Sequence, residues 1–321
     1  TANIVLGETA QKTTNKGIFF AAFYDITKDI NASFEGRIQN DDVTNSSIID
    51  DISRNSSTNS FLPRLAISWT VNEDINFYGQ ISKGNNPAGS NLNNLLPDFK
   101  ATAGLVDARN GNTRVSDILE AFTDYEEEII WTYEIGLKGS LLNKSLRYTT
   151  ALYYTNWTNA LNVATFNWFD GGPEHNGIPD AGYAFPVNYI IPETINAGKI
   201  SGWGWEGDVI YNLTENFDMS VALSYVGNEY TEYCSVDSQD VYGLAATGDI
   251  DGIPCVDIAG NIQSGLSQKS ATLSASYHRE LTNNMEGYIR ADARWASKQY
   301  IDPLNLGWIP SYAKANIRAG I

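Results

Sequence analysis

The sequence predicts an all-β fold: an antiparallel up-and-down sheet of about eleven strands that forms a segment of a transmembrane β-barrel. Apolar and polar residues alternate over runs of about ten residues, roughly twice the usual length of a globular strand and the length of a tilted strand that crosses a bilayer. These runs occur in pairs joined by short polar turns, and longer segments separate the pairs. No run approaches the roughly eighteen apolar residues of a membrane helix, so only a barrel offers a spanning structure.

The clearest pair is the stretch Tyr125–Trp157, which turns at Asn143 and Lys144. Successive side chains of a strand point to opposite faces, so the first arm has one apolar face and one mixed face. The second arm repeats the alternation, which predicts a hairpin with one lipid-facing side. The apolar face of the first arm consists of Ile129, Trp131, Tyr133, Ile135 and Leu137.

The same pattern recurs along the chain. It predicts hairpins over 17–39, 62–81, 203–228 and 272–295, and one more strand over 313–321. Long loops are expected over 40–60, 84–124, 158–196 and 229–266, with a short helix at Val115–Phe122. Short turns at one end and long loops at the other are typical of bacterial outer-membrane barrels.

Charged residues recur in mid-strand on the face opposite the apolar one. A packed protein core would not tolerate them, so we predict that this face lines a wet or plugged lumen. The predicted lumen-facing residues are Glu134, Lys138, Glu206, Asp208, Arg290, Asp292 and Arg294. The residues expected at the membrane interfaces are Trp131, Tyr154, Trp203, Trp205 and Trp295.

The formal charge of −17 argues against nucleic acid, since phosphate binding needs clustered Lys and Arg. The mean hydropathy of −0.28 is that of an ordinary soluble protein, but barrel strands are half polar, so this value does not exclude a membrane. The two cysteines, Cys234 and Cys255, suit an oxidising compartment and predict a disulfide. The chain opens at Thr1 without an apolar leader, which we expect of a mature or truncated product.

The sequence contains no catalytic or cofactor motif. His175 and His278 are the two histidines, and no nucleophile elbow accompanies them. Dinucleotide, P-loop and zinc patterns are absent. Asp249 and Asp251 hint at calcium, but the EF-hand spacing is missing, so a solvated acidic loop is the better interpretation. We therefore expect neither enzyme activity nor a cofactor or metal.

Four stretches, in order, resemble the C-terminal barrel region of TonB-dependent outer-membrane receptors. They are FLPRLAISWTVNEDINFYGQISKGNNPAG (Phe61–Gly89), YEEEIIWTYEIGLKGSLLNKSLRYTTALYYTNW (Tyr125–Trp157), NAGKISGWGWEGDVIYNLTENFDMSVALSYV (Asn196–Val226) and PSYAKANIRAGI (Pro310–Ile321). The resemblance implies a barrel of about 22 strands that an N-terminal plug domain fills. It makes residues 1–321 a partial barrel domain without its plug.

The resemblance implies a receptor in the outer membrane of a Gram-negative bacterium. Its partners would be outer-membrane lipid, lipopolysaccharide and, through a missing N-terminal region, the TonB complex. Its ligand would be a scarce nutrient such as siderophore-iron, cobalamin or a glycan. Receptors of this kind capture ligands with extracellular loops, so the candidate ligand contacts are Trp168, Phe169, His175 and Tyr183. The alternatives are a passive porin and a secreted β-rich adhesin or binding module.

Overall fold

A computed structural model describes residues 9–47, 50–111, 113–169, 188–196, 198–235, 244–250, 253–282 and 285–321. Its main sheet follows the path β1-β2-β3-β4-β7-β8-β11-β12-β16-β17-β20, and each neighbouring pair is antiparallel. The predicted all-β, up-and-down fold is therefore confirmed. The strands on this path are β1 (Thr9–Asp25), β2 (Ile30–Ser47), β3 (Ile52–Asn72), β4 (Ile75–Asn86), β7 (Glu128–Leu141), β8 (Leu146–Thr158), β11 (Gly198–Thr214), β12 (Phe217–Val226), β16 (Lys269–Thr282), β17 (Met285–Ala296) and β20 (Tyr312–Gly320).

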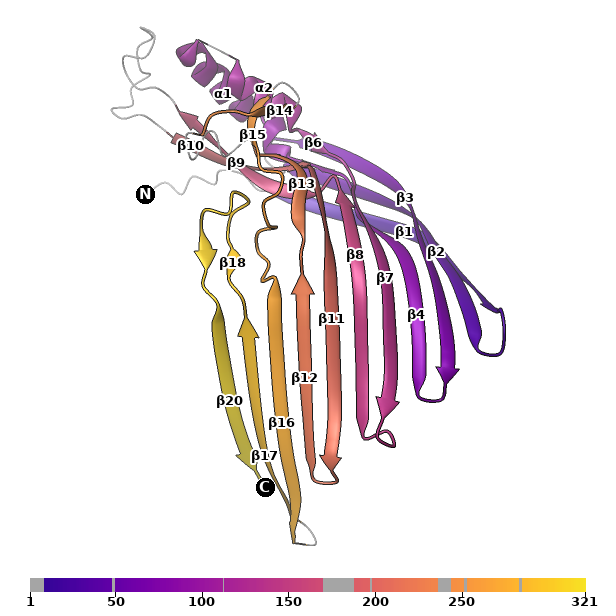
Figure 1. The fold of residues 1–321 in the computed structure, drawn as a ribbon. Helices are drawn as coiled ribbons and strands as arrows, with labels where there is room; N and C mark the ends of the chain where they lie inside the picture. Colours follow the sequence, from indigo (N-terminus) through magenta and orange to yellow (C-terminus); the bar gives the residue numbers. More distant parts are fainter. Residues whose placement is uncertain are drawn as a thin grey trace.

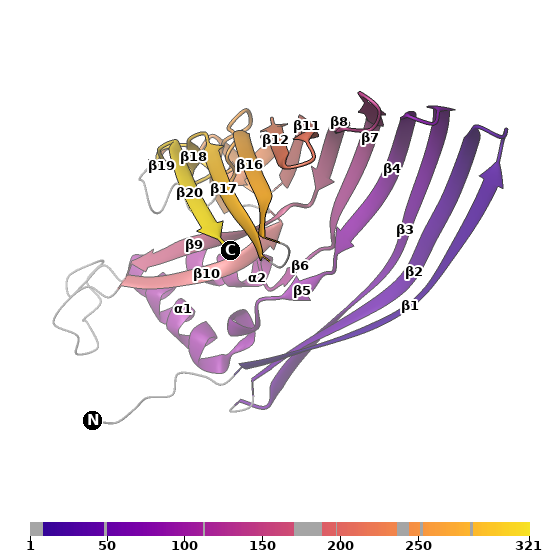
Figure 2. The ribbon, with the colours of Figure 1, turned by 90° about the horizontal axis from the view of Figure 1, so that it is seen from below.

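The sheet is strongly curved and open. Its strands lie side by side in chain order, and β1 and β20 form its two edges (Figure 1). Seen along the strands, the sheet is an arc with a convex and a concave face (Figure 2). Short turns join the strands at one end, which we call the turn end. Long connections join them at the other end, which we call the loop end.

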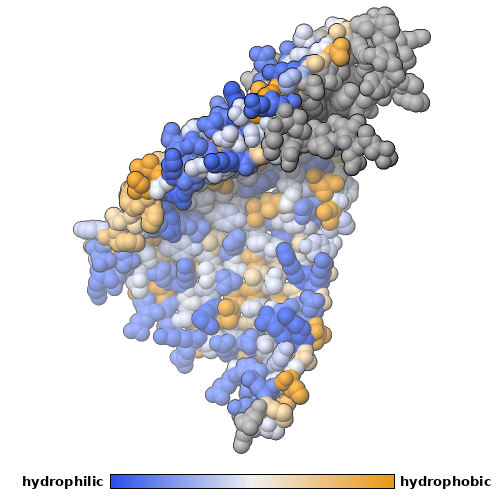
Figure 3. All heavy atoms as spheres, turned by 180° about the vertical axis from the view of Figure 1, so that it is seen from behind, coloured by the Kyte–Doolittle hydropathy of each residue, from blue (hydrophilic) through white to orange (hydrophobic). Residues whose placement is uncertain are grey.

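The cross-strand register gives each face its chemical character. Ile135 pairs with Leu152, and Leu152 pairs with Trp205, so these three side chains share the apolar face. They are exposed, as are most large apolar side chains of this face; the exposed fraction reaches 63% for Ile135. Polar residues predominate on the opposite, concave face (Figure 3). An apolar face of this extent is costly in water and points to lipid.

Aromatic rings cross the apolar face near its loop end. Trp131 and Tyr133 have ring centroids 6.5 Å apart, Tyr133 and Tyr154 are 6.4 Å apart, and Tyr154 and Trp203 are 5.0 Å apart. The four rings belong to β7, β8 and β11 and lie close to the ends of these strands. Rings at this depth are typical of a membrane interface, which stays a prediction for these residues.

Residues 40–47 and 52–60 belong to strands, so the loop predicted over 40–60 is wrong there. β2 continues to Ser47, β3 begins at Ile52, and their register is unbroken as far as this pair. Burial still alternates in this largely polar stretch: Asp41, Val43 and Asn45 are buried, and the residues between them are less buried. Alternation of apolar and polar residues does not reveal such a strand. Its two faces differ in burial, but both consist mainly of polar residues.

The loop 84–124 is also more ordered than expected. It contains β5 (Gly89–Ser90), the 3₁₀ turn η1 (Leu92–Leu95), α1 (Pro97–Asn110), α2 (Arg114–Ala121) and β6 (Asp124–Tyr125). The helix expected at Val115–Phe122 is α2, whereas α1 was not predicted. No helix in the described ranges is long and apolar enough to cross a membrane.

Two more connections carry secondary structure that we predicted as loop. The connection 158–196 contains β9 (Leu161–Phe169) and β10 (Asn188–Asn196), which pair with each other. The connection 229–266 contains β13 (Glu229–Ser235), β14 (Gly248–Ile250) and β15 (Ile253–Asp257). The last, shorter connection contains β18 (Gln299–Tyr300) and β19 (Trp308–Ile309).

These connections pack on one another and form a hydrophobic core outside the sheet. We call the assembly of η1, α1, α2, β5, β6, β9, β10 and β13–β15 the loop cap. Figures 1 and 2 show it at the loop end, with α1, α2 and the β9–β10 hairpin on the concave side of the arc. Burial of apolar surface therefore holds the cap together. Its buried residues include Ile118, Leu119, Phe122, Ile195, Tyr230, Tyr233 and Val256, and the same cluster contains Ile200 of β11 and Ile258, which follows β15.

Candidate ligand site

The predicted ligand contacts fall in or beside the β9–β10 hairpin. Trp168 and Phe169 are the last two residues of β9 and pair with Tyr189 and Asn188 of β10. His175 and Tyr183 lie outside the described residues. A role of these four residues in ligand contact stays a prediction.

Asparagine side chains fasten the β9–β10 hairpin to the neighbouring connection. Asn91 imitates a strand partner of Thr194: its Nδ2 donates to the Thr194 carbonyl (2.7 Å), and its Oδ1 accepts the Thr194 N–H (2.9 Å). Asn196 binds Glu126 in the same manner, since its Oδ1 accepts the Glu126 N–H (2.6 Å) and its Nδ2 donates to the Glu126 carbonyl (3.1 Å). Two amide side chains therefore hold segments that are far apart in the sequence.

Glu193 is a buried carboxyl group that directly precedes Thr194 in β10. Its side chain is 1% exposed, and its Oε1 has no hydrogen-bond partner within the described part of the chain. Burial raises the pKa of Glu193 to about 8, and a hydrogen bond with the Asn94 side chain opposes this shift. Glu193 is therefore protonated and neutral at pH 7. Asn94 is itself completely buried, and its Oδ1 also lacks a partner among the described residues.

Glu193 lines a cavity of about 280 Å³ that we call the polar pocket. The pocket lies where the loop ends of β1 and β2 meet η1, β6 and β10. Asn45 is held in its wall by hydrogen bonds from Nδ2 to the Ser90 carbonyl (2.9 Å) and hydroxyl (3.1 Å). Burial raises the pKa of the Tyr125 phenol, so this group stays neutral as well. The side chains of the lining come from Thr9, Gln11, Asn45, Ser90, Asn91, Asn93, Tyr125, Glu193 and Thr194, besides Ala10 and Leu92.

Two polar contacts support the cap around the pocket. Arg54, at the loop end of β3, forms a bidentate ion pair with Asp124 of β6, in which Nε and Oδ1 are 3.0 Å apart. Asp107 of α1 accepts the N–H groups of Val115 and Ser116 at 2.8 Å each and so caps the first turn of α2. The cap is thus fixed to the sheet and internally by side chains that the sequence analysis did not single out.

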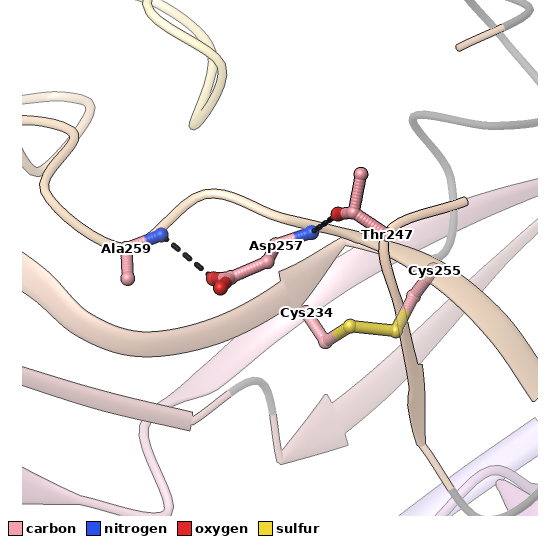
Figure 4. Close-up of a disulfide and its surroundings, with 5 residues drawn as sticks. All are labelled: Cys234, Thr247, Cys255, Asp257 and Ala259. Atoms are coloured by element: carbon pink, nitrogen blue, oxygen red, sulfur yellow. Dashed lines mark hydrogen bonds between the residues drawn. A yellow bond between two sulfur atoms is a disulfide. The ribbon is translucent and has the colours of Figure 1, made fainter. Parts of the chain in front are cut away.

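A disulfide joins Cys234 of β13 to Cys255 of β15, and Cys255 is completely buried (Figure 4). Nearby, the Asp257 N–H donates to Thr247 Oγ1 (2.8 Å), and Asp257 Oδ1 accepts the Ala259 N–H (2.9 Å). The backbone N–H and the carboxylate of Asp257 are therefore both engaged in hydrogen bonds that stabilise the local turn. The described residues contain no cluster of three His, Cys, Asp or Glu side chains suited to a metal. Asp251 lies outside the described residues.

The seven predicted lumen-facing residues all lie on the concave face and form two groups. Glu134, Glu206 and Asp208 line a depression of about 320 Å³ beside Tyr78. The Lys138 ammonium lies 5.0 Å from the centroid of the Tyr78 ring. The Tyr78 ring lies directly over Gly136 of the neighbouring strand. A side chain at position 136 would clash with it, because an added Cβ would be 2.3 Å from the ring. That this face borders a lumen stays a prediction.

The second group is centred on Asp292. Its carboxylate accepts Arg290 Nε (2.9 Å), Ser274 Oγ (2.8 Å) and Arg318 Nη2 (2.6 Å). Arg294 lies on the same face of β17, two residues further along the strand, and pairs in register with Lys314. Arg318 was not among the predicted residues, although its position in the alternation of β20 places it on this face. The concave wall thus carries an acidic group and an ion-paired group.

A curved antiparallel sheet of this length, apolar on its convex face and charged on its concave face, defines the wall of a membrane-spanning β-barrel. The family model described as "TonB dependent receptor-like, beta-barrel" matches residues 4–321. The chain therefore belongs to the family of TonB-dependent receptor β-barrels. Membership places the sheet in the outer membrane, with the turn end periplasmic and the loop cap extracellular.

Solved structures of outer-membrane receptors have the same fold. The ferric yersiniabactin uptake receptor FyuA from Yersinia pestis aligns with a TM-score of 0.57 at 13% identity, over 96% of this chain and 39% of that chain. The ferric preacinetobactin receptor BauA from Acinetobacter baumannii has a TM-score of 0.62 at 14% identity, over 97% and 36%. The copper transporter OprC has a TM-score of 0.55 at 10% identity, over 96% and 39%. The chain thus spans less than two fifths of each of these proteins.

Proposed function

We propose that this chain forms part of the wall and the ligand-capturing surface of an active outer-membrane transport receptor. The receptor binds a scarce nutrient at its extracellular end and imports it with energy coupled through TonB. The observation that carries this proposal is the loop cap, a packed assembly with polar cavities that lies on the concave side of the sheet at the extracellular end.

Family membership supports coupling to TonB. In the proposed receptor, residues 1–321 are part of the barrel domain, and a plug domain and a TonB-binding segment lie elsewhere in the protein. The convex face contacts outer-membrane lipid, and its extracellular rim contacts lipopolysaccharide. Because the matching family model describes TonB-dependent receptors, we assign the chain a receptor role and no enzyme activity.

The nutrient belongs to one of the classes that such receptors import. FyuA and BauA are named for ferric siderophores, and OprC is named for copper. For this chain we retain siderophore-iron, cobalamin and a glycan as candidate classes.

Uptake by intact cells tests this function. The gene that encodes the receptor is deleted, and accumulation of labelled ferric siderophores, cobalamin and oligosaccharides is compared with that of the parent strain and of a complemented strain. We expect deletion to reduce uptake of one ligand class at least tenfold and complementation to restore it. A protonophore should abolish the same uptake.

Two results would contradict the proposal. Unchanged uptake of every ligand after deletion would remove the transport role. Uptake that depends on the gene but persists in the presence of the protonophore would indicate a passive porin instead.

A further inference from the structure

We infer that the polar pocket is a subsite for an uncharged, hydroxyl-rich ligand, namely a sugar ring of an oligosaccharide. This inference rests on the proposed receptor function and names the ligand class that the extracellular end selects. It concerns a different part of the chain from the aromatic residues of β9 that the sequence analysis favoured.

The pocket exists only when the loop cap is folded against the sheet. Gln11 and Asn45 come from the loop ends of β1 and β2, Asn93 from η1, Tyr125 from β6 and Glu193 from β10. The Asn91–Thr194 clasp and the Arg54–Asp124 ion pair hold these elements together. A site assembled from distant segments in this manner is preformed, which reduces the entropy that a ligand must lose on binding.

Several polar groups of the lining are unused. The side-chain amide of Asn91 is fully hydrogen-bonded to Thr194 and Phe122. Both side-chain N–H groups of Asn45 donate to Ser90. Gln11, Asn93 and the Tyr125 hydroxyl form no side-chain hydrogen bond within the described ranges. Amides and hydroxyls both donate and accept hydrogen bonds, and a sugar hydroxyl does the same.

The lining contains one carboxyl group and no Lys, Arg or His among its described residues. The carboxyl group, Glu193, is neutral at pH 7 because burial raises its pKa to about 8. The pocket is therefore uncharged. Recognition of an anionic chelate calls for Arg or Lys, whose guanidinium or ammonium groups form charge-assisted hydrogen bonds. None is available here, so a neutral ligand fits this pocket better.

Glu193 is one of the residues that line the pocket, and its buried Oε1 has no hydrogen-bond partner among the described residues. Buried polar atoms are nearly always hydrogen-bonded, so an unpaired one marks a place where a ligand group or water is missing. A protonated carboxyl donates one hydrogen bond and accepts others, which matches a hydroxyl group of a sugar. Tyr125 adds an apolar ring with a polar tip, which suits the C–H face and the hydroxyl rim of a sugar.

The size of the pocket agrees with a subsite. Its volume of about 280 Å³ lies just below the range of roughly 300–1,000 Å³ for small-molecule sites, so it holds about one or two sugar rings. A complete ferric chelate needs a larger space. The remainder of an oligosaccharide would extend from the pocket along the polar inner side of the cap.

The test uses the full receptor that contains this chain, purified in detergent. Calorimetry measures binding of maltotriose, cellotriose, xylotriose and chitotriose, with ferric enterobactin as an anionic comparison. At least one trisaccharide should bind, and ferric enterobactin should not. Tyr125→Phe, which removes only a hydroxyl, and Asn93→Lys, which places a charge at the exposed rim, should each weaken that binding at least fivefold.

One control separates the pocket from general effects. Asn55→Lys adds the same charge on the outer side of β3 and should change affinity less than twofold.

The inference is overturned if no trisaccharide binds, or if the pocket variants bind it as the wild type does. Energised uptake of another ligand by the same receptor would then leave the transport function intact. Loss of the transport function requires the separate outcome that gene deletion changes no uptake.

Discussion

The side chain of Asn91 and the backbone of Thr194 form a two-hydrogen-bond pair across 103 residues of the chain. The pair has the geometry of neighbouring strands, although one partner is a side chain. Asn91 also donates to the Phe122 carbonyl at 2.7 Å, so one amide ties together the end of α2, the turn η1 and the strand β10. Asn91 therefore fastens β10 to the rest of the loop cap, in addition to the apolar contacts of the buried Ile195.

Replacement of Asn91 by alanine should loosen the β9–β10 hairpin and leave the sheet intact. Each lost hydrogen bond is worth about 1 kcal/mol, and the amide and carbonyl of Thr194 lose their partners. We expect the backbone amides of β10 to exchange hydrogen roughly 5–30 times faster, as a loss of 1–2 kcal/mol implies. Hydrogen-exchange mass spectrometry of the receptor measures this. Asn93→Ala, two residues away and exposed, is the matched control and should leave the hydrogen exchange of β10 unchanged.

Glu193 should make the stability of the hairpin depend on pH. Its pKa is about 8 in the folded cap and near 4.5 when exposed, so the folded state retains a proton that the open state releases. This contribution is complete below about pH 4.5, falls as the pH rises and is lost once the pH passes about 8. The slope between these values is at most about 1.4 kcal/mol per pH unit.

Hydrogen exchange of β10 at several pH values, corrected for intrinsic rates, follows this loss. The comparison is with Glu193→Gln, whose side chain does not titrate and which should show a flatter profile. Identical profiles for the two proteins would show that Glu193 is not buried as described.

Removal of the disulfide should destabilise only the β13–β15 segment. Cys234 and Cys255 are 21 residues apart, and closing a loop of this size contributes about 3 kcal/mol. We expect a broad-specificity protease to cleave the double variant Cys234→Ser, Cys255→Ser in this segment at least tenfold faster; trypsin is unsuitable because residues 229–268 contain no Lys or Arg. The midpoint of thermal unfolding of the barrel should be unchanged. Treatment of the wild type with a reductant should reproduce the effect, and equal protease resistance would disprove it.

Alternation of apolar residues predicts all the strands of the main sheet, because lipid on one side imposes a period of two over a long run. The ends of the strands at the turn end are also predicted well, because short polar turns interrupt the alternation abruptly. In the turn at Asn143 and Lys144, these residues have positive φ values of 54° and 69°. The loop ends are predicted poorly. Beyond the apolar band, β2 and β3 continue with Asn, Asp and Ser, and only packing against the cap distinguishes their faces.

Helix α1 shows a second limit. It has no apolar stripe, so periodicity does not reveal it, although Pro97 at its first turn and Gly111 at its end are the usual helix boundaries. Gly111 adopts φ 66°, a conformation that favours glycine.

The candidate site is less predictable still. The cysteine pair is predicted because the chain has two cysteines. Asn91, Glu193 and Arg318 gain their roles from partners that lie far away along the chain, and no local pattern marks such partners.

The orientation of the sheet is the central claim, and a matched pair of substitutions on β12 tests it most directly. Leu223 is on the convex face, and its neighbour Ala222 is on the concave face opposite Asp208. Leu223→Arg puts a charge into lipid and should destabilise the barrel by about 2–4 kcal/mol if it lies near the bilayer midplane. Ala222→Arg puts the same charge beside Asp208 and should cost less than about 1 kcal/mol.

The free energy of unfolding of the receptor in phospholipid bilayers, obtained by denaturant titration of both variants, decides the matter. A large loss for Leu223→Arg with a small one for Ala222→Arg is the predicted result. Equal losses, or a larger loss for Ala222→Arg, would contradict the assignment of the convex face to lipid.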